Sequence, residues 1–295
     1  MRKVFILLLF FVVVGTIFEA DAQRRKLNKT TIKIEDKFET IDTTLRWVSS
    51  LRIHDDVEKR FLYGCHDNKF QIKVPIALTG LEKNMEFVIQ TLTEKMIGHA
   101  TPTFEDAIKY VEANFSKEID DISFKRENQE IEDDMISAMN SGWTSIRLWP
   151  YFSTSKLVGF VVYSQEGGYG EDQSITNINF VTFVRNASGT EILCDNIYNT
   201  SVADNKILRL INQEISEMNQ KEGGDVYEKA TFVSDNIRIE KTGISYIYKA
   251  NDVASGAREL IAVTISYVRL RPYLRPAFYK LITSSTDWVK YENPF

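Results

Sequence analysis

Strand-like segments joined by short turns fill the middle of the chain, and they constrain its fold most. Four such segments lie between residues 144 and 194, and the stretches between them are rich in Ser, Asn and Gly. Short apolar runs bounded by turn residues of this kind are typical of antiparallel strands that form a meander. The predicted strands are Thr144–Phe152, Leu157–Tyr163, Ile175–Val184 and Glu191–Cys194.

Helical spacing occurs on both sides of this block. Apolar residues recur every three or four positions in Leu81–Met96, in Phe104–Ile122 and in Ile207–Met218. This spacing predicts three amphipathic helices, and Gly223–Gly224 is a typical signal for the end of the last one. Because no long Pro or Ser linker divides the chain, we expect an α+β fold. Antiparallel sheets should pack with these helices in two intimately associated subdomains.

The remaining segments are assigned from the same patterns. Phe70, Ile72 and Val74 alternate with polar residues and predict a strand, as Ile261–Tyr267 does near the C-terminus, with one buried face. A hairpin around Lys241–Gly243 should precede that last strand, and a helix should end the chain. Residues 23–69 show little periodicity and are expected to form an N-terminal extension, whose apolar residues add a strand or a docking segment.

The N-terminus has the pattern of a secretory signal peptide. Arg2 and Lys3 precede an apolar run, Val4–Val14, which is followed by the small-x-small sequence Ala20-Asp21-Ala22. We therefore predict a signal peptide over residues 1–22 that is cleaved after Ala22. A periplasmic or extracellular protein is expected, with no transmembrane segment after cleavage.

The net charge bears on the kind of partner, and the cysteine content bears on a possible disulfide. The formal net charge of −5 argues against a nucleic-acid partner. The chain has two cysteines, Cys65 and Cys194. An even number in an exported chain permits one disulfide, although two separate buried thiols remain the alternative because sequence cannot place the two Cα atoms near each other.

Two parts of the chain resemble known bacterial envelope modules. The stretches Ala230–Ile237, Gly243–Tyr248 and Ile261–Leu274 resemble the extracytoplasmic domain of RsiV-type anti-sigma factors. Upstream, Phe70–Ile97 and Thr144–Ile215 resemble the N-terminal module of PdaC-type peptidoglycan deacetylases. The resemblance implies a PdaC-like α+β module over residues 70–200 and an RsiV-like one over residues 201–295. No metal-binding Asp and His pattern of the deacetylase type follows, so the resemblance does not imply that activity.

The sequence also contains short stretches that resemble enzyme motifs. The trio Ser153–Lys156, Ser234–Asn236 and Lys241–Gly243 has the order of the penicilloyl-serine motifs, but the first is predicted in a turn between strands and the other two flank one hairpin. The clusters His54–Asp56 and Cys65–Asp67 contain zinc-ligand types, but adjacent residues rarely all reach one ion. We therefore predict no catalytic residue, no metal and no cofactor.

These observations favour an exported, non-catalytic envelope protein that binds a protein or peptidoglycan ligand. The predicted contact residues are Tyr169, Asp252 and Arg258, because Tyr169 lies on a Gly-rich turn and the other two lie on a loop near the last strand. Two alternatives stay open. One is an enzyme acting on cell-wall glycan or peptide, which converging carboxylates would favour. The other is a structural subunit, which a large exposed apolar patch would favour.

Overall fold

The computed structural model describes residues 34–54, 59–118, 142–168, 175–185, 189–199, 203–224, 226–254 and 260–292. The predicted signal peptide over residues 1–22 lies outside these ranges, as do Tyr169 and Arg258. Residues from Glu35 onward form one structural unit. Every helix within the described ranges is too short or too polar to cross a lipid bilayer.

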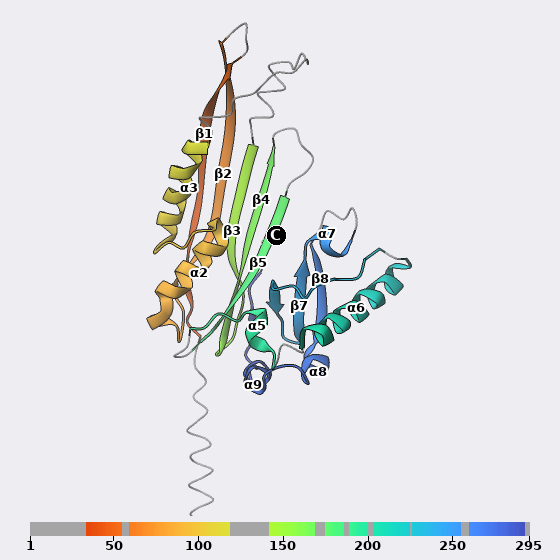
Figure 1. Cartoon of the computed structure of the whole chain (residues 1–295). Helices are drawn as coiled ribbons and strands as arrows, with labels where there is room; N and C mark the ends of the chain where they lie inside the picture. The colour runs from red at the N-terminus through yellow and green to blue at the C-terminus, as the bar shows by residue number, and fades with distance from the viewer. Residues whose placement is uncertain are drawn as a thin grey trace, which may run out of the picture. The chain divides into compact units, whose positions relative to one another are not determined.

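A six-stranded sheet forms the first half of this unit (Figure 1). Strands β1 (Lys37–His54) and β2 (Lys59–Ala77) form a long antiparallel hairpin. Strand β2 also runs parallel to β3 (Gly142–Ser153), and β3, β4 (Leu157–Gly168) and β5 (Ile175–Val184) form an antiparallel meander. The three central strands predicted from the sequence are confirmed.

The connection from β2 to β3 contains the 3-10 turn η1 (Glu82–Asn84) and the helices α2 (Met85–Ile97) and α3 (Phe104–Glu118). A parallel pair of strands needs such a crossover, because a tight turn can join only antiparallel neighbours. Both helices pack against one face of the sheet and bury an apolar core with it. Its members include Phe70, Ile72, Val88, Leu92, Phe104, Leu148, Phe160 and Phe183.

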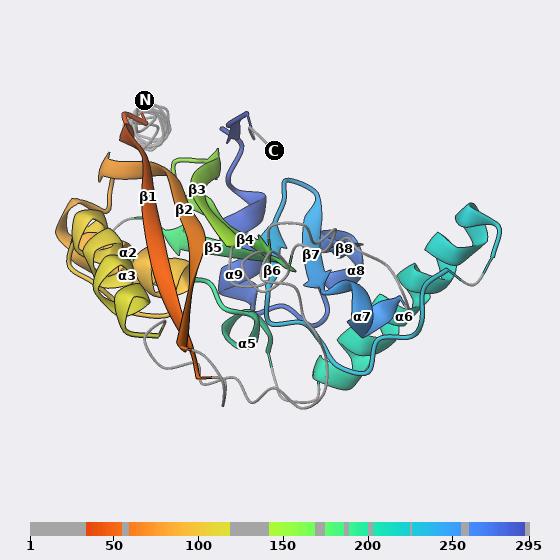
Figure 2. The same cartoon turned by 90° about the horizontal axis from the view of Figure 1, so that it is seen from above.

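A second sheet lies on the other side of the first one (Figure 2). It has three antiparallel strands in the order β6 (Ile237–Ile239), β7 (Gly243–Tyr248) and β8 (Ile261–Ser266). In β8, Ile261, Val263 and Ile265 are buried while Ala262 and Thr264 are exposed, which confirms the predicted alternation. The predicted hairpin between β6 and β7 is also confirmed.

Helices cover the second sheet and complete its core. The longest, α6 (Ala203–Glu222), ends at Gly223 in a left-handed conformation (φ +78°), as its sequence predicts. The terminal helices are α8 (Tyr267–Leu270) and α9 (Pro276–Thr283), and α7 (Ala250–Val253) precedes β8. The core of this half contains Ile207, Ile211, Ile215, Tyr246, Val263, Leu270 and Ile282, together with Phe152 and Leu157 of the first sheet.

The structure differs from the sequence prediction at two places. The predicted strand Glu191–Cys194 is wrong, because Glu191 forms a single bridge with Phe183 and Cys194 begins helix α5 (Cys194–Ile197). The predicted N-terminal extension contributes β1 and the first half of β2, so the boundary placed between residues 69 and 70 lies inside a continuous strand. The short strand β9 (Val289–Lys290) pairs with β3.

A buried ion pair joins the ends of the five long strands. Arg185 follows β5, and Asp36 precedes β1; both side chains are 1% exposed. The Arg185 guanidinium donates to both Asp36 carboxylate oxygens (2.9 and 2.5 Å) and to the Ser153 hydroxyl (2.7 Å). It also donates to the carbonyls of Thr79 (2.6 Å) and Leu157 (3.2 Å). All five guanidinium N–H groups therefore have an acceptor.

Replacing Arg185 with Met should lower the free energy of unfolding by about 3 to 5 kcal/mol, because Asp36 would remain as a buried charge without its partner. Urea denaturation measures this loss. The control is Arg46→Gln: Arg46 also forms a two-bond pair, with Asp67, but is 68% exposed, so its loss should cost less than about 1 kcal/mol. Equal losses in the two variants would contradict the structural role of Arg185.

Candidate functional site

Of the three predicted contact residues, the structure describes Asp252, which lies in helix α7. Its carboxylate accepts a hydrogen bond from the backbone N–H of Lys249 (3.0 Å), so it stabilises the start of that short helix. Asp252 also lines a cavity of about 230 Å³ together with Ser234, Asn236 and Leu260. Tyr169 and Arg258 lie outside the described residues, so their roles as contact residues stay predictions.

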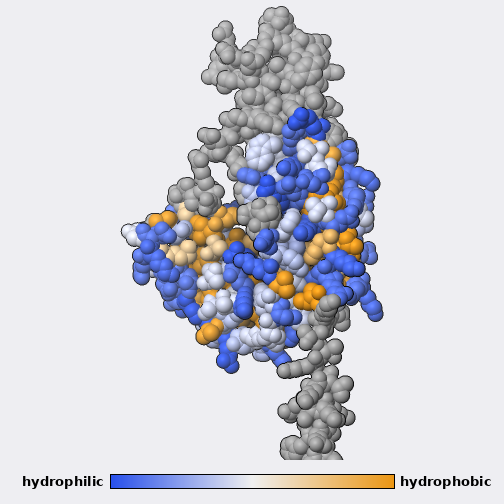
Figure 3. Space-filling model, turned by 180° about the vertical axis from the view of Figure 1, so that it is seen from behind, coloured by the Kyte–Doolittle hydropathy of each residue, from blue (hydrophilic) through white to orange (hydrophobic). Residues whose placement is uncertain are grey.

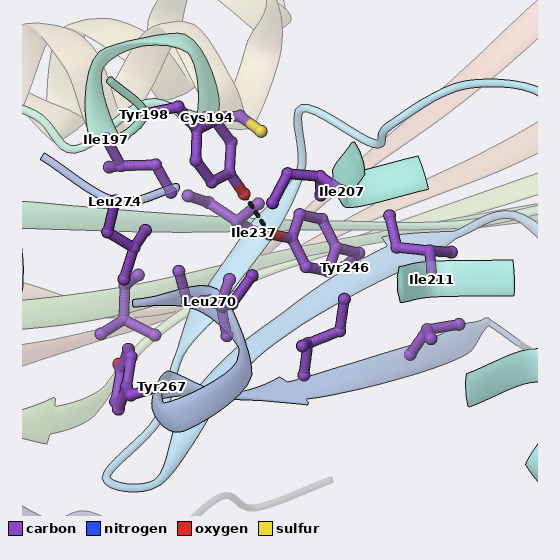
Figure 4. Packing of buried hydrophobic residues seen from close by; sticks show 14 of the residues in the cluster. Cys194, Ile197, Tyr198, Ile207, Ile211, Ile237, Tyr246, Tyr267, Leu270 and Leu274 are labelled. Carbon is purple, nitrogen blue, oxygen red and sulfur yellow. Dashed lines mark hydrogen bonds between the residues drawn. The ribbon is translucent and has the colours of Figure 1, made fainter. Parts of the chain in front are cut away.

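Cys194 carries a buried thiol beside a pair of buried tyrosines (Figure 4). The hydroxyls of Tyr198 and Tyr246 hydrogen-bond to each other, and burial raises the pKa of both phenols far above the usual value. The side chain of Cys65 lies outside the described residues. The structure therefore gives no support to the predicted Cys65–Cys194 disulfide, which stays a prediction.

The residues of the penicilloyl-serine-like trio have structural hydrogen bonds. Ser153 donates to Asp36 (2.9 Å) in the buried ion-pair cluster, and Lys156 donates to Ser284. Ser234 donates to the Ile247 carbonyl (2.5 Å), and the Thr242 carbonyl accepts from the Tyr267 amide. Each hydrogen bond fastens one segment of the fold to another.

The Cys65–Asp67 cluster is similarly engaged, as far as its side chains are described. His66 Nε2 lies 3.2 Å from the Thr144 hydroxyl, and Asp67 pairs with Arg46. Partial burial lowers the pKa of His66, an effect that the nearby Asp67 carboxylate opposes. No group of three metal-ligating side chains comes together within the described ranges. The side chains of His54–Asp56 lie outside them.

A groove of about 680 Å³ lies between the edge of the first sheet and the second sheet. One wall is strand β5 with the segment that leads into α5, and the other is the segment that leads into β6. The start of α6 and Lys95 of α2 complete it. Its lining residues with polar or exposed side chains include Lys95, Asn179, Glu191, Leu193, Asp195, Asn205, Thr231, Phe232, Asp235 and Asn236.

Asparagine side chains hold both walls of this groove in place. The Asn236 amide accepts from the Phe180 N–H (3.0 Å) and donates to the Ile178 carbonyl (2.5 Å), as a neighbouring strand would. On the opposite wall, Asn196 accepts from the Leu193 N–H (3.2 Å) and donates to the Glu191 carbonyl (3.1 Å). Segments outside regular secondary structure thus obtain the backbone hydrogen bonds that burial requires.

Asparagine side chains of α6 also bond the backbone of a neighbouring segment. Asn212 and Asn219 lie seven residues, or about two turns, apart on one helix face. Asn212 bonds the N–H and carbonyl of Ala230 (2.8 and 3.1 Å), and Asn219 bonds those of Tyr227 (both 2.7 Å). These residues are not among the predicted site residues, although the seven-residue spacing of the two asparagines on a predicted helix is a usable signal.

Tyr248 holds the segment before β6, which forms the second wall of the groove, at Phe232 and Ser234. Its hydroxyl donates to the Phe232 carbonyl (2.9 Å) and accepts from the Ser234 N–H (3.3 Å), and its ring makes an edge contact with the Phe232 ring, with centroids 5.5 Å apart. Burial raises the pKa of Tyr248 to about 12, so this phenol stays protonated and donating at neutral pH. The Phe232 side chain is nevertheless 46% exposed.

Carboxylates outnumber cations along the groove. Glu191, Asp195 and Asp235 line it against the single ammonium group of Lys95. Burial raises the pKa of Glu191; the Lys95 charge opposes this shift and the Glu94 carboxylate adds to it. The groove therefore suits a ligand with hydroxyl or amino groups better than an anion.

Replacing Asn236 with Ala should expose the Phe180 N–H to solvent and lower the free energy of unfolding by about 1 to 3 kcal/mol. Hydrogen exchange measures the first effect directly, and the Phe180 amide should exchange faster than in the wild type. Asn114→Ala is the control, because the Asn114 amide bonds the Tyr110 carbonyl in an exposed position. Unchanged protection of Phe180 would contradict the role assigned to Asn236.

Comparison with known proteins bears on the fold. None of the known protein-family models matches the chain. No curated protein matches it significantly. A DUF3298 family protein from Bacteroides fragilis, of known crystal structure, superposes with a TM-score of 0.56 at 13% identity, over 86% of this chain and 100% of that one. A DUF3298 protein from Pseudomonas aeruginosa gives a TM-score of 0.50 at 10% identity, over 82% and 97%.

The chain has the fold of DUF3298 proteins. This family is related to the RsiV- and PdaC-type domains that the sequence resembles, and the predicted α+β class is confirmed. At these identities the DUF3298 likeness concerns the fold alone. The chemistry of the groove has to be argued from its own residues.

Proposed function

We propose that the chain is an exported binding module of the bacterial envelope, of the RsiV and PdaC type, and that the groove takes a cell-wall ligand. Its carboxylate and amide side chains offer partners for the hydroxyl and amino groups of a glycan or peptide. The excess of carboxylates disfavours an anionic ligand.

The observation that carries this proposal is the position of two exposed apolar side chains in a polar groove. Leu193 and Phe232 are 42% and 46% exposed, and they lie on the two opposite walls that Asn196 and Asn236 hold. A rigid apolar anchor among hydrogen-bonding groups is typical of ligand sites. A sugar ring or an aliphatic peptide side chain fits such a pair.

Replacing Phe232 with Ala should reduce binding to isolated peptidoglycan by about tenfold or more, because an anchor residue contributes roughly 2 kcal/mol at such sites. Co-sedimentation of the protein from Gln23 onward with peptidoglycan measures this. Phe87→Ala is the matched control: Phe87 is 45% exposed and makes an edge contact with the buried Phe183, but lies outside the groove. Failure of the wild type to sediment, or equal loss in both variants, would contradict the proposal.

A second candidate is a hydrolase that acts on the same ligands. The specific observation is that Glu191 has a raised pKa and shares the groove with Asp195 and Asp235. A carboxyl group that stays protonated can act as a general acid, while a second carboxylate acts as base or nucleophile. The structural-subunit alternative has less support, because hydrophobic residues on the side shown in Figure 3 form separate patches.

If this second candidate holds, the wild type should release soluble fragments from peptidoglycan, and Glu191→Gln should abolish that release. A general acid works only while protonated, so activity should fall as the pH rises through the raised pKa of Glu191. Glu228→Gln, which removes an exposed carboxylate outside the groove, should leave the release unchanged. No release by the wild type from about pH 4 to about pH 8 would remove the hydrolase from consideration.

A further inference from the structure

The segment that contains the last two helices carries cations without carboxylates. Residues 260–286 include Arg269, Arg271, Arg275 and Lys280 and contain no Asp or Glu, although the whole chain has a net charge of −5. The four cations belong to α8, to α9 and to the turn between these helices. Arg269 is half-buried and the other three are exposed. This segment is therefore an exception in an acidic chain.

The start of helix α6 adds two exposed cations beside this segment. The Lys206 ammonium lies 5.8 Å from the centroid of the Tyr273 ring. The Arg269 guanidinium donates to the Gln213 side chain (3.0 Å). Arg209 lies between Lys206 and Gln213 on one stripe of α6, because residues three or four positions apart are neighbours on a helix. Figure 1 shows this end of α6 next to α8 and α9. Together these cations define a basic patch made of Lys206, Arg209, Arg269, Arg271, Arg275 and Lys280.

Few carboxylates oppose the basic patch. Within the described residues, Arg269 alone of its six members forms an ion pair, and its partner is Glu214. Glu217 lies further along the same helix, and the side chain of Asp204 is outside the described residues. Residues 200–202, which precede α6 and are also outside them, are Thr, Ser and Val. Even if Glu217 and Asp204 both face the patch, six cations oppose three carboxylates, and this local excess attracts anions.

An apolar side chain projects from the same surface. Val268 of α8 is 82% exposed, more than any other large hydrophobic residue that the structure describes. Its neighbours Tyr267 and Leu270 are buried in the core, so α8 is held with Val268 on the outside. Arg269 follows it directly, and Arg271 lies one helical turn further on. The most exposed apolar side chain is therefore flanked by two cations of the basic patch.

We propose that the basic patch docks on a bilayer surface that carries anionic lipids. Guanidinium and ammonium groups bind the phosphates of lipid headgroups. Val268 enters the boundary between headgroups and acyl chains, as apolar side chains of interfacial segments do. A soluble polyanion would satisfy the cations but offers no apolar phase for Val268. The basic patch acts independently of the groove, in which carboxylates are in excess.

The test is co-sedimentation of the protein from Gln23 onward with vesicles of phosphatidylcholine that contain about 30% phosphatidylglycerol, at low salt. Vesicles of phosphatidylcholine alone are the neutral comparison. The patch variant is the triple substitution Arg209→Gln, Arg271→Gln and Lys280→Gln, which removes exposed cations that form no ion pair within the described residues. Residues 23–34, which carry five further cations, are the same in every variant, so any binding by them cancels.

Two matched controls separate the patch from general effects. The triple substitution Lys83→Gln, Lys221→Gln and Lys229→Gln changes the net charge equally, but these exposed cations lie outside the patch. The second pair tests the apolar contact at constant charge. Val268→Ser removes the projecting side chain, whereas Val226→Ser removes a side chain that is 51% exposed near the far end of α6.

The patch variant should bind the anionic vesicles about tenfold or more weakly than the wild type, and the triple control should bind like the wild type. Val268→Ser should weaken binding about threefold, and Val226→Ser should not. Binding should also fall as salt is added. Peptidoglycan sedimentation of the patch variant should be unchanged, because the groove is intact.

Three results would overturn the proposal. The first is absence of wild-type binding, or equal binding to neutral and anionic vesicles. The second is an equal loss in the two triple variants. The third is binding that Val268→Ser leaves unchanged and that soluble polygalacturonate or single-stranded DNA competes away, which would assign the patch to a soluble polyanion.

Discussion

The buried pair of Arg185 and Asp36 is the interaction on which the arrangement of the first sheet depends. It joins residues next to the ends of β1, β2, β3, β4 and β5 through one guanidinium group. Desolvating two charges costs several kcal/mol, and only complete hydrogen bonding offsets that cost. Because each donor of Arg185 has an acceptor, a shift of any one strand end would leave at least one buried N–H group of Arg185 without its acceptor.

The position of the strand ends also determines the geometry of the groove. Arg185 directly follows β5, and the chain then returns along the same strand, where the Ile192 N–H donates to the Thr182 carbonyl (2.7 Å) before α5 begins. Nearer the start of β5, Asn236 occupies the edge that a further strand would otherwise take. The sheet edge is thus covered by side-chain amides and short bridges, which leave room for a ligand where a continuous strand would fill the space.

Much of this fold is predictable from the sequence, because it rests on periodicity. Alternation in Ile261–Ser266 and helical spacing in Ile207–Met218 give the correct elements and the correct buried faces. The long β1–β2 hairpin is less evident, since a bulge beside Phe38 interrupts the alternation and many of its residues are Thr or charged. Glu191–Cys194 has strand-like composition, but the Asn196 side chain bonds its backbone and favours a helix start.

The candidate site could not be predicted in the same way. A lone arginine after a strand usually lies on the surface, and nothing local shows that Arg185 meets Asp36, 149 residues earlier. The groove likewise combines Lys95, Glu191 and Phe232 from distant segments. Their proximity has no local signal in the sequence, whereas the composition of turns favours Tyr169 and Arg258 as contact residues. Asp252 lies in the neighbouring cavity, which also shares Phe232 and Asp235 with the groove.

The most direct test of this account is an NMR titration of the isotope-labelled protein with soluble peptidoglycan fragments. Binding in the groove predicts that the backbone signals of Phe180, Leu193 and Phe232 shift together and saturate at one fragment concentration. Signals that stay unchanged at these three positions, or shifts confined to the opposite side of the first sheet, would contradict it.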